Sequence, residues 1–382
     1  MEYRTAGESH GRMLVALVSG VPAGIALSAA DIQRDLERRQ RGYGRGGRQQ
    51  IECDEASILS GVRFGATIGS PVALTIANRD WENWSEVMPV GGDRAEAPRV
   101  TAPRPGHADL AGYQRTGTDD VRDVLERASA RETAARVAAG AVARALLRAL
   151  GVEVSSWVER IGDASCGALD PERVDPAVVE ASDVRCPDSA AAVLMRRAID
   201  VAKADGESVG GIAAVRATGL VPGLGSYAER ASGLDATIAR AVVSIPAVKG
   251  VEFGDGFELA KRPGSLAHDP IVKDASGVLG RASNHAGGIE GGMSNGETLV
   301  VRFAMKPIPT LARPLATVDL DSGEVADAAR ERSDVCAVPA AAVVAEAEVA
   351  MVLADAHLRM FGDSCVPDIA VSLARYRERI GW

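Results

Sequence analysis

The segment over residues 134–150 limits most strongly what this chain can fold into, because alanine and other small residues occupy many of its positions. A helix with so many small side chains can bring its backbone close to a neighbour. The segment therefore predicts a helix that packs tightly against a sheet or another helix. Thr118 or Asp119 is the expected cap of a longer helical region that ends at Leu150.

A polar cluster of Arg127, Ser129 and Arg131 interrupts this region and leaves two alternatives open. If the helix breaks there, the cluster and the free N–H groups of a new helix start would form an anion site. If the helix is continuous, Arg127 and Arg131 form a pair four residues apart on an exposed face.

Strand-like apolar segments alternate with helical ones along the rest of the chain. Strands are predicted over residues 13–18 (buried), within 56–76, and over 152–161, 210–219, 250–257 and 298–305. Helices are predicted over residues 28–40, 189–204, 234–243, 339–354 and 368–379. No internal repeat and no linker rich in Gly, Ser or Pro separates these segments. We therefore expect one large α/β domain over residues 1–382.

Charge and composition exclude several classes of protein. A net charge of −9 argues against a nucleic-acid partner, which favours a basic face. No apolar run reaches the ~18 residues of a membrane span, and no basic-then-apolar leader is present, so we expect a cytoplasmic protein without a membrane partner. The five cysteines are widely spaced and form no Cys-x-x-Cys pair, which indicates neither a zinc site nor a disulfide framework.

The N-terminal stretch over residues 6–12 places His10 between polar neighbours and two glycines, Gly7 and Gly11. Such a tight turn suits the presentation of an imidazole to a small ligand. The alternative is a polar N-terminal loop in which the histidine is incidental.

A second polar stretch, residues 38–48, is rich in arginine and glycine. Its spacing Gly42-x-Gly44-x-x-Gly47 matches the dinucleotide fingerprint, but that fingerprint needs a strand before it and a helix after it. Here a helix comes before and a strand-like segment after, so we reject the match. We expect an arginine loop that folds over a polyanionic small molecule, with a solvated basic surface loop as the alternative.

Further loops carry the same kinds of side chain. Prolines and a glycine fix the backbone around Arg104 and His107, which suits either an acid catalyst or a structural turn. Many arginines with few acids imply a ligand with several negative charges, and two loop-held histidines imply proton transfer near neutral pH. No metal-ligand spacing occurs, so the cations and not a metal would stabilise charge.

Seven motifs, in order along nearly the whole chain, resemble those of the chorismate synthase family. They are Gly7-Glu8-Ser9-His10-Gly11, Arg41-Gly42-Tyr43-Gly44-Arg45-Gly46, Arg104-Pro105-Gly106-His107-Ala108-Asp109, Glu126-Arg127-Ala128-Ser129-Ala130-Arg131-Glu132-Thr133, Gly287-Gly288-Ile289-Glu290-Gly291-Gly292, Lys306-Pro307-Ile308-Pro309-Thr310 and Arg332-Ser333-Asp334-Val335-Cys336.

The resemblance implies the 1,4-trans elimination of phosphate from 5-enolpyruvylshikimate 3-phosphate, which gives chorismate in the last common step of the shikimate pathway to aromatic amino acids. It implies a lyase that needs reduced FMN without net redox change. It also implies a β-α-β sandwich with helices packed between sheets, and a cytoplasmic homotetramer.

The resemblance also implies roles for individual residues. His10 would protonate or hydrogen-bond the reduced flavin near its N1 edge, and His107 would donate a proton to the leaving phosphate or hold its charge. Asp334 would assist proton removal at the flavin N5. Substrate would be bound by Ser9, Arg39, Arg45, Arg48, Arg104, Ser129, Arg131 and Arg332. The cofactor would be bound by Arg39, Arg45, Arg127, Ala128, Ser129, Pro246, Ala247, Gly291, Lys306, Pro307, Ile308, Pro309, Thr310 and Arg332.

Two departures from the family pattern concern His285, where many relatives carry arginine, and Pro246, where glutamine is common. Two other functions remain open. One is a non-catalytic anion-binding protein on the same fold. The other is a flavin reductase in which Arg39 and Arg45 contact NADPH. No separate nicotinamide domain is visible, which favours a protein that receives its reduced flavin from elsewhere.

Overall fold

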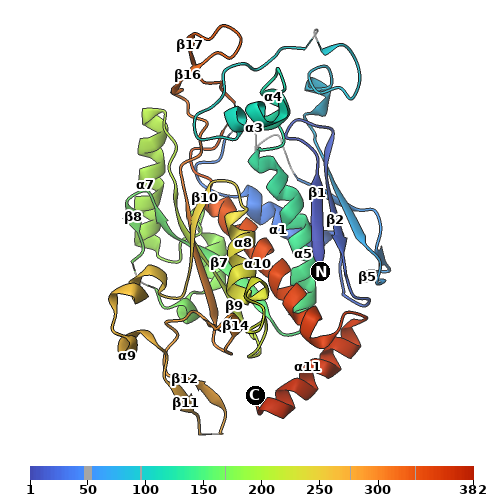
Figure 1. Ribbon diagram of the computed structural model, residues 1–382, viewed down its shortest axis with the longest axis vertical. Helices are drawn as coiled ribbons and strands as arrows, with labels where there is room; N and C mark the ends of the chain where they lie inside the picture. The colour runs from blue at the N-terminus through green and yellow to red at the C-terminus, as the bar shows by residue number, and fades with distance from the viewer. Residues whose placement is uncertain (47–53, 95–96, 168, 276, 332) are drawn as a thin grey trace.

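Two antiparallel sheets lie on either side of a layer of helices in the computed structural model (Figure 1). The structure describes residues 1–46, 54–94, 97–167, 169–275, 277–331 and 333–382. This arrangement is the predicted β-α-β sandwich.

The first sheet has the strand order β1-β2-β6-β3. Its strands are β1 (Glu2–Ala6), β2 (Met13–Ser19), β6 (Val72–Ala77) and β3 (Ala56–Ile58). Leu14, Ala16 and Val18 of β2 are buried in the core, whereas Met13 and Leu17 on the other face are exposed. The strand predicted over residues 13–18 is therefore confirmed, but the prediction that it is buried holds for one face only.

The second sheet has the strand order β10-β15-β9-β7-β8. Its strands are β10 (Val248–Phe253), β15 (Leu299–Met305), β9 (Gly211–Thr218), β7 (Glu153–Ile161) and β8 (Ala164–Ser165). Val215 of β9 lies opposite Val301 of β15 and Ser156 of β7, which fixes the register at the centre of the sheet.

Four helices fill the space between the sheets. They are α1 (Ala29–Gln40), α5 (Thr133–Ala149), α8 (Leu234–Val243) and α10 (Val338–Phe361). α5 packs on β2 and β6 of the first sheet, α10 packs on β7 and β9 of the second, and the two helices contact each other extensively. A Cβ atom on Gly140 of α5 would lie 2.3 Å from the Cβ of Ala347 in α10. The close packing predicted for residues 134–150 is thus confirmed.

The helical region before α5 is broken. α4 (Arg122–Leu125) is capped at its C-terminus by Glu126, and a 3₁₀ turn (Ala130–Glu132) leads into α5. The side chain of Asp120 accepts the backbone N–H of Arg122 at 2.9 Å, so the prediction of Thr118 or Asp119 as the cap is wrong. The alternative of a broken helix is the correct one.

The other elements lie around this three-layer core. The helices are α3 (Asp109–Thr116), α6 (Pro176–Ala181), α7 (Ser189–Asp205), α9 (Gly264–Ala267) and α11 (Val366–Ile380). The short hairpins are β4 (Val62–Arg63) with β5 (Ala66–Thr67), β11 (Ile271–Lys273) with β12 (Leu279–Arg281), β13 (Ile289–Glu290) with β14 (Met293–Ser294), and β16 (Ala316–Val318) with β17 (Val325–Asp327). Among the described residues, none of the helices is both long and apolar enough to cross a membrane.

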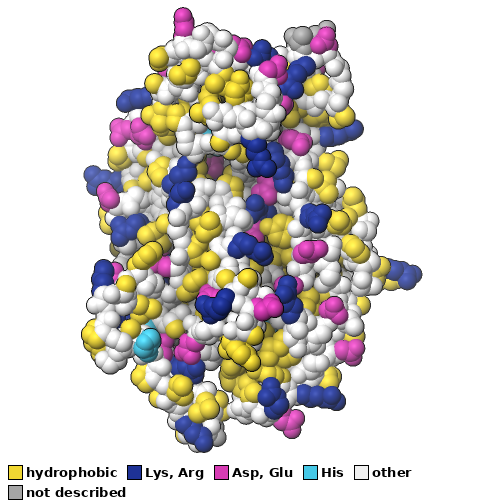
Figure 2. Space-filling view, in the orientation of Figure 1, with side chains coloured by type: hydrophobic (Ala, Val, Ile, Leu, Met, Phe, Trp, Pro, Cys, Tyr) yellow, Lys and Arg dark blue, Asp and Glu magenta, His cyan; other side chains and the backbone are white. Residues whose placement is uncertain are grey.

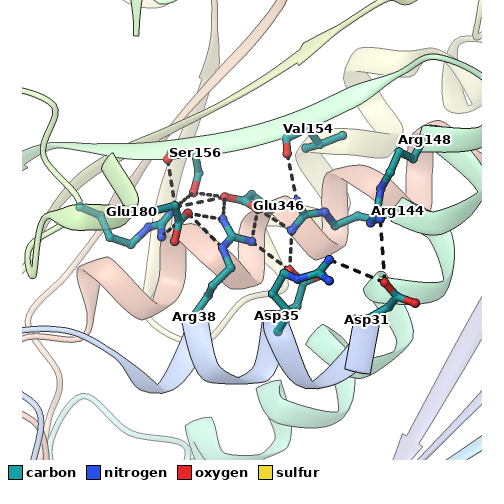
Figure 3. Close-up of polar contacts among 11 residues, drawn as sticks. Asp31, Asp35, Arg38, Arg144, Arg148, Val154, Ser156, Glu180 and Glu346 are labelled. Carbon is teal, nitrogen blue, oxygen red and sulfur yellow. Dashed lines mark hydrogen bonds and ion pairs between the residues drawn. The ribbon is translucent and has the colours of Figure 1, made fainter. Parts of the chain in front are cut away.

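A buried charge network joins α1, α5, α10 and β7 (Figure 3). Glu346 of α10 is fully buried and accepts hydrogen bonds from Arg38 at 2.8 Å, Arg144 at 2.9 Å and Ser156 at 2.6 Å. Burial by itself raises the pKa of Glu346, but the charges of Arg38 and Arg144 outweigh burial and lower this pKa to about 2. The helix layer is therefore held by ion pairs as well as by apolar packing, which the sequence reading did not predict.

Candidate active site

A cavity of about 510 Å³ opens between the N-terminal turn, the arginine loop, the loop before α3 and the start of α10. Figure 2 shows a hollow in the upper part of the molecule, with Lys and Arg side chains beside it. The cavity volume lies within the range of roughly 300–1,000 Å³ that is typical of small-molecule sites.

The N-terminal turn brings His10 into this cavity. Gly7 has a φ of 105°, and a Cβ there would lie 2.3 Å from the carbonyl oxygen of Met13, so this close turn requires glycine. Glu126 receives the backbone N–H of His10 at 2.8 Å, and its Oε1 lies 2.8 Å from Nδ1 of the ring. Trp84 stacks on the ring, with centroids 3.6 Å apart and an interplanar angle of 19°.

Glu126 is buried next to the side chains of His10 and Arg122. Arg122 donates to its Oε1 at 3.2 Å, beside the contact from His10. Burial raises the pKa of Glu126, but the hydrogen bonds and charge of His10, with the charge of Arg122, leave this pKa below its ordinary value. A negative charge is thus held directly behind the His10 ring.

His107 has a similar partner. Its Nδ1 makes a short contact with Asp109, which is fully buried at the start of α3. Arg104 donates to Asp109 from Nε at 2.8 Å and from its backbone N–H at 3.0 Å, and also reaches the hydroxyl of Thr310 at 3.0 Å. Burial raises the pKa of Asp109, but the hydrogen bonds from His107 and Arg104 hold it well below its ordinary value.

The break before α5 turns two serines towards each other. Ser129 caps the 3₁₀ turn by accepting the backbone N–H of Arg131, and its hydroxyl donates to Ser9 at 3.1 Å. Ser9 in turn donates its backbone N–H to the backbone carbonyl oxygen of Glu126 at 2.9 Å. The break in the helix therefore connects the motif over residues 126–133 to the N-terminal turn.

Two buried arginines share one carboxylate. Asp54 lies 3.1 Å from Nη1 of Arg39 and makes a shorter contact with Nη1 of Arg131. Arg39 also donates to Thr133 at 3.0 Å. Burial, with the neighbouring charges of Arg45 and Arg131, lowers the pKa of Arg39 to about 10, although Asp54 opposes this shift.

The arginine loop is anchored by Asp334. Arg45 donates to Oδ2 at 2.6 Å, and the backbone N–H of Gly46 donates to Oδ1 at 2.7 Å. The expectation of many cations with few acids is therefore wrong for the described part of the cavity. Each described arginine in the lining, buried or half-buried, pairs with a carboxylate, namely Asp54, Asp109 or Asp334.

The remainder of the cavity lining is largely apolar. It comes from the ends of α8 and β15, the segment after β15 and the start of α10: Ile245, Pro246, Ala247, Met305, Ile308, Pro309, Ala337, Ala340, Ala341 and Val344. Lys306 ties two of these loops together, because its Nζ donates to the carbonyl oxygen of Gly106 at 2.6 Å.

Most of the residues proposed from the sequence meet in this one cavity. Those that line it are Ser9, His10, Arg39, Arg45, Arg104, His107, Ala128, Ser129, Arg131, Pro246, Ala247, Lys306, Ile308, Pro309, Thr310 and Asp334. Arg48 and Arg332 lie outside the described residues.

Three proposed cofactor residues do not line it: Arg127, Gly291 and Pro307. Arg127 instead donates to the backbone oxygens of Gly7 at 3.0 Å and Thr5 at 3.1 Å, which holds the N-terminal turn in place. Gly291 lies between β13 and β14.

The sequence reading gave no role to Asp54, Trp84, Asp109 or Glu126. Two of them had a signal that went unused, since Asp109 follows His107 by two residues and Glu126 precedes the polar cluster directly. Asp54 and Trp84 stand in stretches without such a signal. Only the fold brings Trp84 into the cavity lining and Asp54 into contact with Arg39 and Arg131.

Comparison with known proteins agrees with this site and fold. A family model described as "Chorismate synthase" matches residues 1–358. A chorismate synthase of Rubrobacter xylanophilus is 54% identical over 386 residues, which cover 99% of this chain and 97% of that protein. One of Moorella thermoacetica is 54% identical over 379 residues and covers 99% of this chain and 98% of its own. A solved structure, "Crystal Structure of Chorismate Synthase", superposes with a TM-score of 0.81 at 39% identity and covers 99% of this chain and 98% of its own. The chain therefore belongs to the chorismate synthase family.

Proposed function

We propose that this enzyme catalyses the 1,4-trans elimination of phosphate from 5-enolpyruvylshikimate 3-phosphate to give chorismate, as a carbon–oxygen lyase of the shikimate pathway. The observation that supports this most is the joining of two carboxylate-backed histidines, three buried arginines and the half-buried Arg45 in one cavity. A substrate with carboxylates and a phosphate needs such cations, and loss of phosphate needs a proton donor or a held charge at the leaving oxygen.

The cavity also fits reduced FMN. Its apolar lining from α8, β15 and α10 suits the flat face of a flavin, and the arginines and Lys306 suit a phosphate. Arg39, Arg45, Ala128, Ser129, Pro246, Ala247 and the Lys306–Thr310 segment would hold the group. Arg127, Gly291, Pro307 and Arg332 stay proposed contacts. When bound, the reduced flavin supplies electron density as the C–O bond breaks.

The side chains of this chain would then bind, orient and move protons. His107 stands beside Arg104, which suits donation of a proton to the leaving phosphate or stabilisation of its charge. His10 would hold a proton at the ring nitrogen that faces the cofactor. Asp334 would accept a proton, and its contacts with Arg45 and Gly46 fix the position of its carboxylate.

Substrate binding is proposed for the cationic part of the lining. Arg39, Arg45, Arg104 and Arg131 would bind the carboxylates and phosphate, with Ser9 and Ser129 as hydroxyl donors; Arg48 and Arg332 stay proposed partners. Because carboxylates already hold these arginines in place, little reorganisation is needed when substrate binds. A cytoplasmic homotetramer remains part of this proposal.

An anaerobic assay tests the function. The purified protein, chemically reduced FMN and 5-enolpyruvylshikimate 3-phosphate are expected to yield chorismate, and absence of product would contradict the proposal. A parallel reaction with NADPH and oxidised FMN in air shows whether the enzyme reduces its own flavin. We expect no NADPH consumption in that reaction.

The two histidines provide a sharper test. Changing His10 or His107 to alanine is expected to lower kcat by about 10²–10⁴-fold, because each moves or holds a proton in the reaction. The variant His268→Ala, at the end of α9 and outside the cavity lining, is the matched control and should keep wild-type turnover. Near-normal rates for both cavity variants would contradict the assigned roles.

A further inference from the structure

We infer that Glu126 and Asp109 are positioning residues that fix the tautomer of His10 and His107 and present Nε2 of each ring to the ligands. This inference rests on the proposed function and deepens it. It starts from a repeated arrangement: each cavity histidine meets a buried carboxylate at Nδ1, although one carboxylate comes from the end of α4 and the other from the start of α3.

The ring of His10 is held at one edge and on one face. Both oxygens of Glu126 lie near Nδ1, at 2.8 and 3.1 Å, and the same carboxylate receives the backbone N–H of His10. Trp84 covers one face of the ring, and the guanidinium of Arg122 lies 5.5 Å above the Trp84 ring while it donates to Glu126. One carboxylate thus sets both the backbone and the side chain of His10.

Asp109 fixes His107 in a comparable way. Arg104 holds the carboxylate with three donors, its backbone N–H, Nε and Nη2, at 3.0, 2.8 and 3.2 Å. Nη2 of Arg104 also lies 3.1 Å from Nδ1 of His107, but the contact of this ring nitrogen with Asp109 is much shorter. We therefore assign Nδ1 of His107 as a donor to Asp109.

A carboxylate at Nδ1 has two chemical consequences. It keeps the neutral ring in the Nδ1–H tautomer, so that Nε2 carries the lone pair, and it stabilises the imidazolium that forms when Nε2 takes a proton. Within the described residues, the hydrogen bonds of both histidine rings are at Nδ1, which leaves Nε2 for the ligands. Each histidine can then take and return a proton without turning.

The exchange of each carboxylate for its amide tests this inference. The backbone N–H of His10 meets Oε2 of Glu126, whereas Arg122 and Nδ1 of His10 meet Oε1. In Glu126→Gln the amide oxygen is expected to keep the backbone N–H of His10, so the NH₂ group takes the place of Oε1, faces Nδ1 and favours the wrong tautomer. In Asp109→Asn the oxygen stays with Arg104, and the NH₂ group faces His107. We expect kcat to fall about 10²–10⁴-fold in each variant while KM changes less than about threefold.

The tautomer is read directly by ¹⁵N NMR of the histidine rings in the full-length protein, which has only five histidines. His10 and His107 should be protonated at Nδ1 in the wild-type protein and at Nε2 in the corresponding amide variant. A third pair, His285 with Asp255 at 2.7 Å, lies outside the cavity lining and supplies the control. Asp255→Asn should leave kcat and the His10 and His107 signals unchanged.

Glu126→Asp keeps the negative charge and is the control for a general folding defect. It should retain the Nδ1–H tautomer of His10 and recover much of the turnover lost in Glu126→Gln. An unchanged tautomer in both amide variants, or wild-type kcat in both, would overturn the inference. The ¹⁵N signals of His10 and His107 test the positioning roles whether or not the enzyme turns over substrate. Absence of chorismate from the wild-type reaction would overturn only the proposed function.

Discussion

Trp84 contributes to the site by its position against the ring of His10. It stands just after the 3₁₀ turn Trp81–Asn83, where its indole N–H donates to Asp80 at 3.1 Å and its ring stacks on His10. Trp84 thus covers one face of the His10 ring, and the carboxylate of Glu126 contacts its edge at Nδ1. We therefore expect Trp84 to limit the tilt of His10 while a ligand occupies the cavity.

Truncation of the Trp84 side chain is expected to lower kcat only modestly. Aromatic stacking is worth about 0.5–1.5 kcal/mol, so Trp84→Ala is expected to lower kcat about 2- to 10-fold, and Trp84→Phe should keep most of the activity. Trp81→Ala, which changes a tryptophan in the same loop that does not line the cavity, is the control. Steady-state kinetics distinguishes the variants, and equal losses at Trp81 and Trp84 would argue against a role for the stack.

The histidines could be found from the sequence because glycines and prolines mark their loops locally. Their carboxylate partners could not be assigned in the same way. Glu126 acts on a residue that is 116 positions away, and Asp54 joins two arginines from different parts of the chain. Such pairs depend on the fold and leave no periodic signal. The binding roles of the individual arginines stay predictions.

At the scale of elements, the contact between α5 and α10 decides how close the two sheets come. Gly140 lies directly against Ala347, and a side chain at residue 140 would also come within 2.6 Å of the Cα of Ala347. The obstacle is backbone and not a flexible side chain. The start of α10, with Ala337, Ala340 and Ala341, forms part of the cavity lining, so this packing also sets the cavity wall.

Gly140→Ala is accordingly expected to destabilise the protein by about 1–3 kcal/mol, despite the higher helix propensity of alanine, because the two helices must move apart. Gly264→Ala is the matched control, since a Cβ at that helical glycine would meet only His268, at 3.8 Å. Denaturant unfolding measures both variants. A Gly140→Ala protein as stable as the wild type would show that the helices do not pack this closely.

The sequence predicted most elements because their apolar periods are local. The helix predicted over residues 28–40 is present, with Ser28 as its cap and Gln40 as its last residue, and the helix over residues 234–243 has the predicted bounds. The helix predicted over residues 339–354 corresponds to α10, which runs to Phe361 because no glycine stands before Gly362 to end it. The break before α5 could not be decided from the sequence, since it depends on contacts of Ser129 with the N-terminal turn.

At the scale of the molecule, a large apolar core cluster extends through both sheets and the helix layer, and the single domain over residues 1–382 stays a prediction. The Glu346 network crosses the same layer and joins segments from Arg38 to Glu346. A buried carboxylate with three arginine partners is costly to disturb, because removal of one charge leaves the others unpaired.

Glu346→Gln is therefore expected to lower the free energy of unfolding by about 3–5 kcal/mol at pH 7. The folded pKa of about 2 lies below the ordinary value of 4.5, so the stabilisation by the charged form is complete above pH 4.5 and is lost as the pH falls towards 2. The difference between wild type and variant should shrink over that window. Glu37→Gln, at an exposed pair with Arg41 at 3.9 Å, is the control and should cost about 0–1 kcal/mol.

The most direct test of the account is the stoichiometry of an anaerobic reaction with limiting reduced FMN. Chorismate, phosphate and the redox state of the flavin are measured in the same sample. The account predicts equal amounts of chorismate and phosphate, in large excess over the flavin, with the flavin still reduced at the end. Chorismate that never exceeds the flavin, or flavin that is oxidised in proportion to product, would contradict it.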